Sequence, residues 1–385
     1  MNSSSETSGI LYNLFNSTVI PNVSSQTSIY QNFDKSFEDD CSELITECTC
    51  HIVYSFYEYP EIILLGVVAF PLIIFGIINN ILSILIFTHE LMKTSSINWY
   101  LTIISLSDTI ILISAFFVLT LPRLGEFIEL WGAVSLRQVY FLAPYMYGMM
   151  TMAQTISVWM TTGVSLHRYA GVCFPFESIS LLRPKKVRTF IGSILIFSIV
   201  FNSSRFFEVN VVNDCYRTNI EYSIPVIMPT LLRINEAYRT IFFGWAYTIV
   251  MFIIPFIVLI FVNTAVVSVI HKSNRLHLTQ GSDSMTFKKS ETKERQTTIM
   301  LVAIVIVFLA CNVLAFVVNI MENLNLMGSL YNTLVWFNNL LVLVNASCNF
   351  LIYLIFSDKY RALLLYFISG KCLIQERTLV LAEVV

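Results

Sequence analysis

The stretch IILLGVVAFPLIIFGIINNILSILIF, residues Ile62–Phe87, contains no charged side chain. A helix that crosses a bilayer needs roughly 20 predominantly apolar residues, so this stretch predicts a membrane span. Similar unbroken apolar runs follow at Tyr100–Leu121, Tyr140–Ser165, Phe190–Phe201, Ile241–Ile270, Ile299–Ile320 and Thr333–Phe356. The sequence therefore predicts an all-α membrane protein, a seven-transmembrane helix bundle, over residues 62–356.

The composition of the whole chain supports this prediction. Charged residues make up only 12% of it and hydrophobic residues 56%, whereas a soluble domain carries about 25% charged residues. The formal net charge of −2 leaves no basic surface for nucleic acid. The motifs HEXXH, GxSxG and the phosphate loop are all absent from the sequence. We therefore expect neither an enzyme nor a nucleic-acid-binding protein.

The distribution of charge predicts how the bundle is oriented. Residues 1–61 are acidic, carry glycosylation sequons at Asn2, Asn16 and Asn22, and show no cleavable signal peptide. Fifteen of the 23 Lys and Arg residues lie instead in alternate loops and in the tail: Lys93, Arg183, Lys185, Lys186, Arg188, Lys272, Arg275, Lys288, Lys289, Lys293, Arg295, Lys359, Arg361, Lys371 and Arg377. Because basic loops stay in the cytosol, we expect a multi-pass plasma-membrane protein with an extracellular N-terminus and a cytoplasmic C-terminus.

Several shorter segments carry predictions of their own. The polar stretch His271–Glu294 predicts a mobile cytosolic loop. In the cytosolic tail, residues 357–385, Leu363–Phe367 predict a short amphipathic helix that lies on the inner membrane face. Cys372 follows this helix and is a candidate for palmitoylation, with a free thiol as the alternative. A fourth sequon, at Asn202, lies near the outer end of the fourth span.

Asp108 is the only carboxylate deep inside an apolar run. A buried carboxylate needs a cation or several hydrogen-bond donors, or else it protonates. The candidate partners are Ser157 on the third span and Asn345 and Asn349 on the seventh, with Asn80 as a further amide. We expect Asp108, Ser157, Asn345 and Asn349 to hold a sodium ion, and a hydrogen-bonded cluster without an ion is the alternative.

A stripe of polar residues follows one face of the third span. Its members recur at helical spacing: Tyr147, Gln154, Ser157, Thr161 and Arg168. Such a stripe must face the interior of the bundle, where it either lines a site or packs helices together.

The ordered set of motifs resembles the rhodopsin-like (class A) G-protein-coupled receptors. The matching features are Asn80, Ser105-Leu-Ser-Asp108, His167-Arg168-Tyr169, Pro255, Asn349-Phe-Leu-Ile-Tyr353 and Phe356 with Tyr360-Arg361. The resemblance covers all seven spans and implies coupling to a heterotrimeric G protein. It implies that Arg168, Tyr169, Tyr353 and Phe176, which follows Cys-Phe-Pro175, take part in that coupling.

A narrower resemblance is to invertebrate FMRFamide-type neuropeptide receptors. It is carried by Ala-Pro144-Tyr, Gln154-Thr-Ile-Ser-Val-Trp, Arg205-Phe-Phe-Glu208, Thr230-Leu-Leu-Arg-Ile-Asn-Glu-Ala-Tyr238, Cys311-Asn312, Asn319 with Glu322, and Asn345-Ala-Ser-Cys-Asn349-Phe350. This resemblance implies that the ligand is a short amidated peptide.

Some positions depart from the class A pattern. Ala143 replaces the Cys at the outer end of the third span, Asn312 and Leu314 replace a Trp and a Pro in the sixth, and His167 replaces the acidic residue before Arg168. Without a Cys on the third span, Cys215 is expected to pair with one of the N-terminal cysteines Cys41, Cys48 or Cys50. The other departures bear on receptor activation.

The resemblance also implies where the peptide binds. FMRFamide-type peptides end in Arg-Phe-amide, so the site needs a carboxylate for the guanidinium and an aromatic slot for the ring. Glu322 follows Asn319 by three residues on one helical face, and it is the expected carboxylate. Glu208 and Glu236 are the competing carboxylates, and Trp336, Tyr147 and Gln154 are expected to line the slot.

The sequence thus predicts a G-protein-coupled receptor for a short amidated neuropeptide. Its partners are the peptide, a heterotrimeric G protein and membrane lipid, with no cofactor other than the sodium ion. The alternatives are a divergent chemosensory receptor of the same architecture and a membrane transporter or channel. Ligand-evoked G-protein activation without current or uptake separates the receptor from the transporter.

Overall fold

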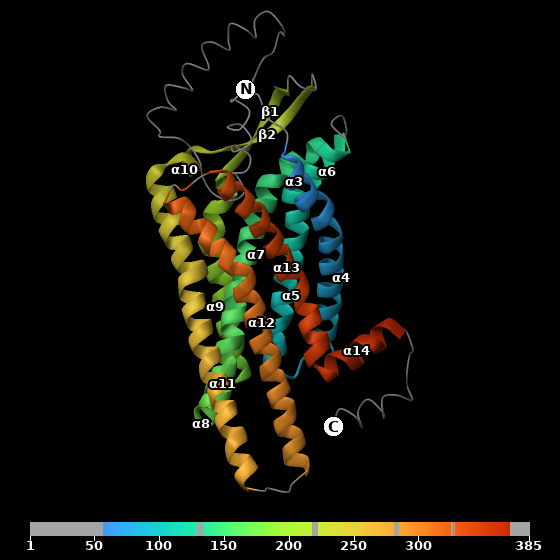
Figure 1. The fold of residues 1–385 in the computed structure, drawn as a ribbon, viewed down its shortest axis with the longest axis vertical. Coiled ribbons are helices and arrows are strands. Elements are labelled where there is room, and N and C mark those ends of the chain that lie inside the picture. The colour runs from blue at the N-terminus through green and yellow to red at the C-terminus, as the bar shows by residue number, and fades with distance from the viewer. Residues whose placement is uncertain are drawn as a thin grey trace, which may run out of the picture.

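Long helices that run side by side make up most of the structure (Figure 1). The computed structural model describes residues 57–128, 134–217, 222–280, 285–324, 326 and 328–369. The first half of the chain contains α3 (Tyr59–Glu61), α4 (Ala69–Thr88), α5 (Ser96–Ala115), α6 (Leu121–Phe127), α7 (Val134–Cys173), α8 (Pro175–Leu181) and α9 (Pro184–Asn202). The second half contains α10 (Leu231–Ile234), α11 (Ile254–Gln280), α12 (Met285–Asn323), α13 (Ser329–Phe356) and α14 (Asp358–Ser369).

Short segments of other helical geometry extend several of these helices. Ile62–Val68, Phe116–Thr120, Tyr238–Ala246 and Ile249–Ile253 are π-helical, and Ser203–Phe207 is a 3₁₀ turn that continues α9. The combined stretches are long enough to cross a membrane because a helix rises about 1.5 Å per residue.

Six stretches of the described residues are long and apolar enough to span a membrane. They are Tyr59–Thr88, Ser96–Gly125, Pro184–Phe207, Tyr238–Lys272, Arg295–Asn323 and Ser329–Phe356. They match the first, second, fourth, fifth, sixth and seventh predicted spans. The fourth begins earlier than predicted, at Pro184, because the helix includes the basic turn that precedes the apolar run.

The third predicted span belongs to α7, which is less apolar than the other six. Its 40 residues reach about 60 Å at the rise of an α-helix. It contacts α5, α9, α11 and α12, and it lies among the other helices in Figure 1. The polar stripe faces inward as predicted, since Tyr147, Ser157 and Thr161 are all buried. A helix surrounded by protein can carry polar groups that a lipid-facing helix cannot.

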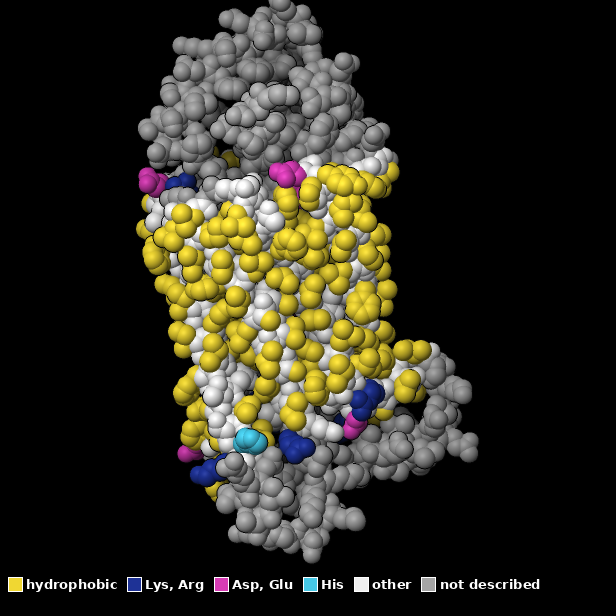
Figure 2. Space-filling view, viewed as in Figure 1, with side chains coloured by type: hydrophobic (Ala, Val, Ile, Leu, Met, Phe, Trp, Pro, Cys, Tyr) yellow, Lys and Arg dark blue, Asp and Glu magenta, His cyan; other side chains and the backbone are white. Residues whose placement is uncertain are grey.

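An apolar surface covers the face of the bundle seen in Figure 2, between its two ends. Large side chains of the spans such as Ile257, Phe261, Ile306 and Ile355 are exposed, which is the arrangement expected where lipid takes the place of water. Charged side chains gather at the two ends of this face.

The two strands form an element that the sequence did not predict. β1 (Val209–Arg217) pairs antiparallel with β2 (Tyr222–Pro229), and a register irregularity lies between Val212 and Cys215. This hairpin packs on α7, and Val209 and Ile227 enter the same buried cluster as Tyr147 and Ala143. We call this end of the bundle the hairpin end and the opposite one the α14 end.

The prediction of a loop at His271–Glu294 is wrong for most of that stretch. α11 continues to Gln280 and α12 begins at Met285. The stretch is polar because these helix ends project beyond the apolar part of the bundle (Figure 1), and the sequence reading took polarity for a lack of structure.

The short helix after the seventh span is confirmed as α14. Leu363 and Leu364 are buried in the cluster that also holds Tyr100, Tyr353 and Tyr360. The hydroxyl groups of Tyr360 and Ser83 lie 2.7 Å apart, so α14 is attached to α4 by a polar contact as well as by packing.

Candidate functional site

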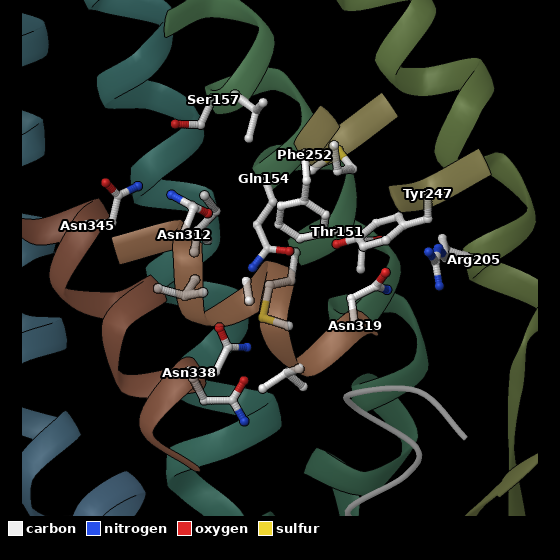
Figure 3. A pocket seen from close by; sticks show the side chains of 18 of the residues that line it. Thr151, Gln154, Ser157, Arg205, Tyr247, Phe252, Asn312, Asn319, Asn338 and Asn345 are labelled. Atoms are coloured by element: carbon white, nitrogen blue, oxygen red, sulfur yellow. The ribbon is translucent and has the colours of Figure 1, made fainter. Parts of the chain in front are cut away.

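A cavity lies in the hairpin half of the bundle, between α7, α12 and α13 and the π-helical segments that precede α11 (Figure 3). It has a volume of about 100 Å³. Six of the predicted site residues line it, namely Tyr147, Gln154, Ser157, Asn319, Glu322 and Asn345. Part of the polar stripe of α7 therefore forms one wall, which is one of the two roles that the stripe left open.

The polar lining consists mainly of carboxamides. Gln154 projects from α7, Asn312 and Asn319 from α12, and Asn338, Asn339 and Asn345 from α13. Figure 3 shows the labelled amides placed around one hollow. An amide both donates and accepts hydrogen bonds, so this wall suits a ligand that is rich in peptide groups. Asn312, which looked like a departure from the class A pattern, supplies one of these amides.

The apolar lining comes largely from the fifth and sixth spans. Phe243 and Phe252 lie on the π-helical segments, Tyr247 lies between these segments, and Phe308 lies on α12. Phe252 and Phe308 belong to a buried cluster with Met251 and Val158. Aromatic rings prefer edge-to-face contacts with other rings, so this side of the cavity suits an aromatic group.

Two charged side chains line the cavity, Arg205 and Glu322. Both are buried, with 1% of Arg205 and 7% of Glu322 exposed. Glu322 lies one turn beyond Asn319 on α12, as its spacing predicted. Thr248 donates a hydrogen bond to Asn319, and Asn323 donates one to Thr248 at 3.3 Å, so this end of α12 is fastened to the fifth span.

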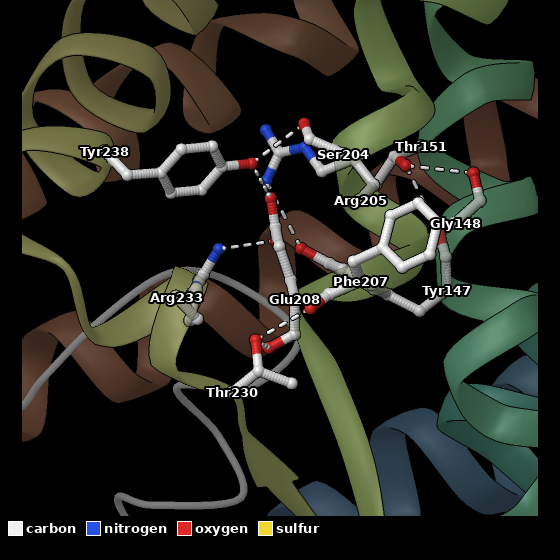
Figure 4. A network of polar contacts seen from close by, with 10 residues as sticks. All are labelled: Tyr147, Gly148, Thr151, Ser204, Arg205, Phe207, Glu208, Thr230, Arg233 and Tyr238. Carbon is white, nitrogen blue, oxygen red and sulfur yellow. Dashed lines mark hydrogen bonds and ion pairs between the residues drawn. The ribbon is translucent and has the colours of Figure 1, made fainter.

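Glu208, the first competing carboxylate, is already paired with the protein's own cations. One carboxylate oxygen, Oε2, accepts from Arg233 Nη1 at 2.9 Å and from Arg205 Nη1 at 3.3 Å. The other oxygen accepts from the Tyr238 hydroxyl at 2.6 Å (Figure 4). Glu208 is fully buried and does not line the cavity. The prediction that it contacts the ligand is therefore not supported by its position, and its contacts link segments at the hairpin end to one another.

Two other predicted contacts also lie outside the cavity. Trp336 is buried in a cluster with Leu65, Val318 and Tyr331, so it packs α13 against its neighbours. Glu236 is exposed between α10 and the fifth span. The sequence did not show which side of α13, or of the segment that holds Glu236, faces the cavity.

Asp108 is fully buried below the cavity. Its Oδ1 accepts a hydrogen bond from Ser157 at 2.9 Å, and its Oδ2 accepts one from Asn349 at 2.8 Å. Asn345, the third expected partner, lines the cavity. Asn80 donates to the backbone oxygen of Ala346 at 2.8 Å. The described residues contain no group of three His, Cys, Asp or Glu side chains that could hold a metal ion.

At the α14 end, the predicted coupling residues differ in exposure. Phe176 on α8 is 89% exposed, whereas Tyr353 is fully buried beside Phe87 and Tyr360. Tyr169 packs edge-on against Phe174 with ring centroids 5.5 Å apart. His167 packs edge-on against Tyr100, and within the described part of the chain neither of its ring nitrogens has a hydrogen-bond partner. His167 therefore does not hold Arg168 as a neighbouring carboxylate would.

The expectation of a glycan at Asn202 is contradicted by its burial. The side chain is fully buried and donates to Thr155 Oγ1 at 2.9 Å and to the backbone oxygen of Ser198 at 2.8 Å. A glycan is bulky and must sit on the surface. Asn202 forms a sequon with the two serines that follow it, but its side chain links α9 to α7 inside the bundle.

The remaining sequence predictions fall outside the described residues. These are the sequons at Asn2, Asn16 and Asn22, the palmitoylation site Cys372, the N-terminal cysteines and the side chain of Cys215. Among the described side chains, Cys173, Cys311 and Cys348 are free thiols.

Comparisons with known proteins identify the class of the fold. A family model described as "Serpentine type 7TM GPCR chemoreceptor Srw" matches residues 67–371. The "FMRFamide receptor" of Drosophila melanogaster is 31% identical over 296 residues, which cover 76% of this chain and 51% of that receptor. The chain thus spans about half the length of the fly receptor.

Two relatives from Caenorhabditis elegans match over a larger share of their own length. The "Probable G-protein coupled receptor frpr-1" is 30% identical over 82% of this chain and 81% of that protein. The "FMRFamide peptide receptor frpr-18" is 28% identical over 78% and 68% of the two chains. The protein is a multi-pass G-protein-coupled receptor and not an enzyme. It belongs to the serpentine 7TM GPCR chemoreceptor Srw family, related to FMRFamide receptors, as the sequence motifs predicted.

Proposed function

We propose that the protein is a plasma-membrane receptor that binds a short amidated peptide of the FMRFamide type and activates a heterotrimeric G protein. Its relationship to two proteins named as FMRFamide receptors supports this class of ligand. The proposed orientation, with the hairpin end outside and the α14 end in the cytosol, rests on the basic loops at the α14 end.

The observation that carries the proposal is the combination of groups around the cavity. Among the described residues that line it, Glu322 is the one carboxylate, and it is almost fully buried. A guanidinium binds a desolvated carboxylate through two parallel hydrogen bonds. The rings of Phe252 and Phe308 offer an apolar place for the C-terminal phenylalanine, and the amides of α12 and α13 suit peptide groups and a terminal carboxamide.

The size of the cavity supports entry of only the end of the peptide. Ligand-binding clefts for drug-sized molecules have volumes of about 300–1,000 Å³, whereas this cavity has about 100 Å³. The preceding residues of the peptide would therefore lie toward the hairpin end.

The first test is a screen of amidated peptides against cells that express the full chain with a promiscuous G-protein reporter. An active peptide is then studied in a double-mutant cycle, in which Glu322→Gln is combined with replacement of the peptide arginine by citrulline. We expect each single change to cost about 2–5 kcal/mol and the second change to add little to the first. Glu236→Gln is the matched control, since Glu236 is exposed and lies outside the cavity. Additive losses would show that Glu322 does not contact the arginine.

The description of the matching family as chemoreceptors favours one alternative, a receptor for a non-peptide chemical. The same cells distinguish the two functions. A response to small organic compounds and to none of the amidated peptides would replace the peptide proposal. Net current or uptake without a G-protein response would contradict both.

A further inference from the structure

The polar network at the hairpin end contains more positive than negative charge. Arg205 and Arg233 both bind Glu208, at 3.3 Å and 2.9 Å. Arg205 is 1% exposed, Arg233 is 3% exposed and Glu208 is fully buried. In the described part of the chain, no second carboxylate forms an ion pair with either guanidinium. Two buried cations therefore share one anion, and an uncompensated buried charge is costly.

Each guanidinium also keeps an N–H group without an acceptor. Nε of Arg205 and one terminal nitrogen, Nη2, of Arg233 are buried and have no hydrogen-bond partner among the described residues. A buried donor without an acceptor costs about 1–3 kcal/mol, and more when the group is charged. Such atoms in a native structure need an explanation, and a ligand that binds there is one.

Aromatic rings stabilise part of this positive charge, but they do not supply hydrogen-bond acceptors for the N–H groups. Phe243 lies close to both guanidiniums, with its ring centroid 3.8 Å from Cζ of Arg205 and 3.5 Å from Cζ of Arg233. The ring centroid of Tyr247 lies 4.9 Å from Cζ of Arg205. A ring face attracts a cation, yet it does not accept in-plane N–H bonds as a carboxylate does. The rings therefore hold the guanidiniums in position and leave the donors for an anion.

Arg205 can be reached from the cavity, because it forms part of its lining together with Tyr147 and Tyr247 (Figure 3). Its Nη1 group donates to Glu208 and, at 3.4 Å, to the hydroxyl of Tyr147 (Figure 4). Arg233 does not line the cavity, and it binds the same oxygen of Glu208 as Arg205 does. Arg205 is thus the group that would contact a ligand, and Arg233 supplies the excess charge behind it.

We propose that Arg205, with Arg233 behind it, is an anion subsite of the cavity that binds a carboxylate of the ligand. This inference rests on the proposed peptide function and adds to it that the peptide carries an Asp or Glu side chain close to its Arg-Phe-amide end. The two charged residues of the lining then select a ligand that carries a positive and a negative group, with its arginine at Glu322 and its carboxylate at Arg205. A peptide without this carboxylate would leave Arg205 and Arg233 with Glu208 as their shared ion-pair partner.

The main test changes the peptide rather than the receptor, so folding is not in question. Amidated peptides that end in Arg-Phe are made in pairs, with Asp or Asn at each of the three positions before the arginine. Their potency is measured on the full-length receptor in cells. At one position we expect the Asp peptide to be more potent than the Asn peptide by at least about tenfold, which corresponds to 1.4 kcal/mol. A ratio below about twofold at every position overturns the proposal.

Receptor variants then assign the preference to Arg205. With Arg205→Gln the Asp and Asn peptides should become equally potent, and Arg205→Lys should keep part of the preference because it keeps the charge. Arg239→Gln is the matched control, as Arg239 lies in the same region without lining the cavity. Surface staining of a tagged receptor checks that each variant folds, and an Asp preference that survives Arg205→Gln assigns the carboxylate elsewhere and overturns the subsite.

A separate measurement tests the anion subsite in the case that the proposed peptide function is wrong. If no Arg-Phe-amide peptide activates the receptor, the purified full chain is unfolded by heat in benzoate and in benzamide, which share a shape and differ in charge. We expect benzoate alone to raise the midpoint of unfolding for the wild type, with no rise for Arg205→Gln. An equal effect of the two compounds, or no effect, overturns the anion subsite independently of the peptide.

Discussion

Asp108 is a carboxylate with two neutral hydrogen-bond donors and no cationic side chain beside it. Ser157 and Asn349 each satisfy one of its oxygens, but neither supplies a positive charge. Burial without a counter-charge leaves two outcomes, protonation of the carboxyl group or binding of a small cation. We propose the second, with sodium held at Asp108 and Ser157 and the Asn side chains of α13 nearby.

The sodium proposal predicts how salt affects the wild type and one variant. The purified receptor should unfold at a higher temperature in sodium chloride than in choline chloride of equal ionic strength, because an ion that binds only the folded state stabilises it. Asp108→Asn should remove this difference, since the amide lacks the charge. Equal unfolding temperatures of the wild type in the two salts would show that the cluster is a hydrogen-bonded unit without an ion.

Individual site residues could be predicted from the sequence only in part. The stripe of α7 and the spacing of Asn319 and Glu322 identified one wall of the cavity, because helical periodicity fixes which side chains share a face. Arg205 and Arg233 belong to two motifs that resemble neuropeptide receptors, but the sequence assigned neither of them a role. Their partner, Glu208, was assigned to the ligand because no local pattern says which two loops meet in space.

At the scale of elements, the Glu208 network joins three parts of the chain. Arg205 lies in the turn after α9, Glu208 precedes β1, and Arg233 and Tyr238 lie in α10 and at the start of the fifth span. Thr230 adds a hydrogen bond from its hydroxyl to the backbone oxygen of Phe207 at 2.7 Å. The network therefore fixes both ends of the hairpin to the outer ends of the fourth and fifth spans.

This joining role predicts a large loss of stability on removal of the shared carboxylate. Glu208→Gln leaves two buried guanidiniums without a counter-charge, and breaking a buried pair in this way costs about 3–5 kcal/mol. We expect a lower unfolding temperature of the purified receptor and less of it at the cell surface. Glu236→Gln, an exposed change a short distance along the chain, should leave both unchanged. A Glu208→Gln protein as stable as the wild type would mean that the network contributes little to stability.

The long helices followed from the unbroken apolar runs of the sequence, and two features were missed. The hairpin was missed because the segment between the fourth and fifth apolar runs was taken as a loop. The ends of α11 and α12 were taken for a loop because their sequence is mostly polar, and a polar sequence without an apolar stripe gives no signal of a packed helix.

For the whole molecule, the α14 end offers an exposed apolar surface on α8. Phe176 is 89% exposed, Ile179 is 74% exposed, and no residue of α8 is buried. Large apolar side chains gathered at a polar end of a protein mark a contact site for a partner or for lipid. We propose that Phe176 enters a groove of the G protein.

That role predicts a defect in signalling without a defect in ligand binding. Phe176→Ala should lower the maximal G-protein response while peptide affinity stays within about twofold, because an interface residue far from the cavity removes only partner contacts. Ile257→Ala on the exposed apolar face of α11 is a control for general loss of apolar surface. Normal coupling by the Phe176→Ala receptor would assign this side chain to the lipid surface instead.

The low apolarity of α7 has a consequence for how the chain is made. Each span must leave the protein-conducting channel for lipid during synthesis, and polar residues near the centre of a span oppose that step. α7 has the length for a crossing but is not among the six stretches that qualify by composition. We therefore expect α7 to insert only together with α5, with which it packs along the bundle. A reporter that records membrane integration should show poor insertion of α7 alone and efficient insertion of the α5–α7 pair, and efficient integration of α7 alone would show that its polar stripe is no barrier.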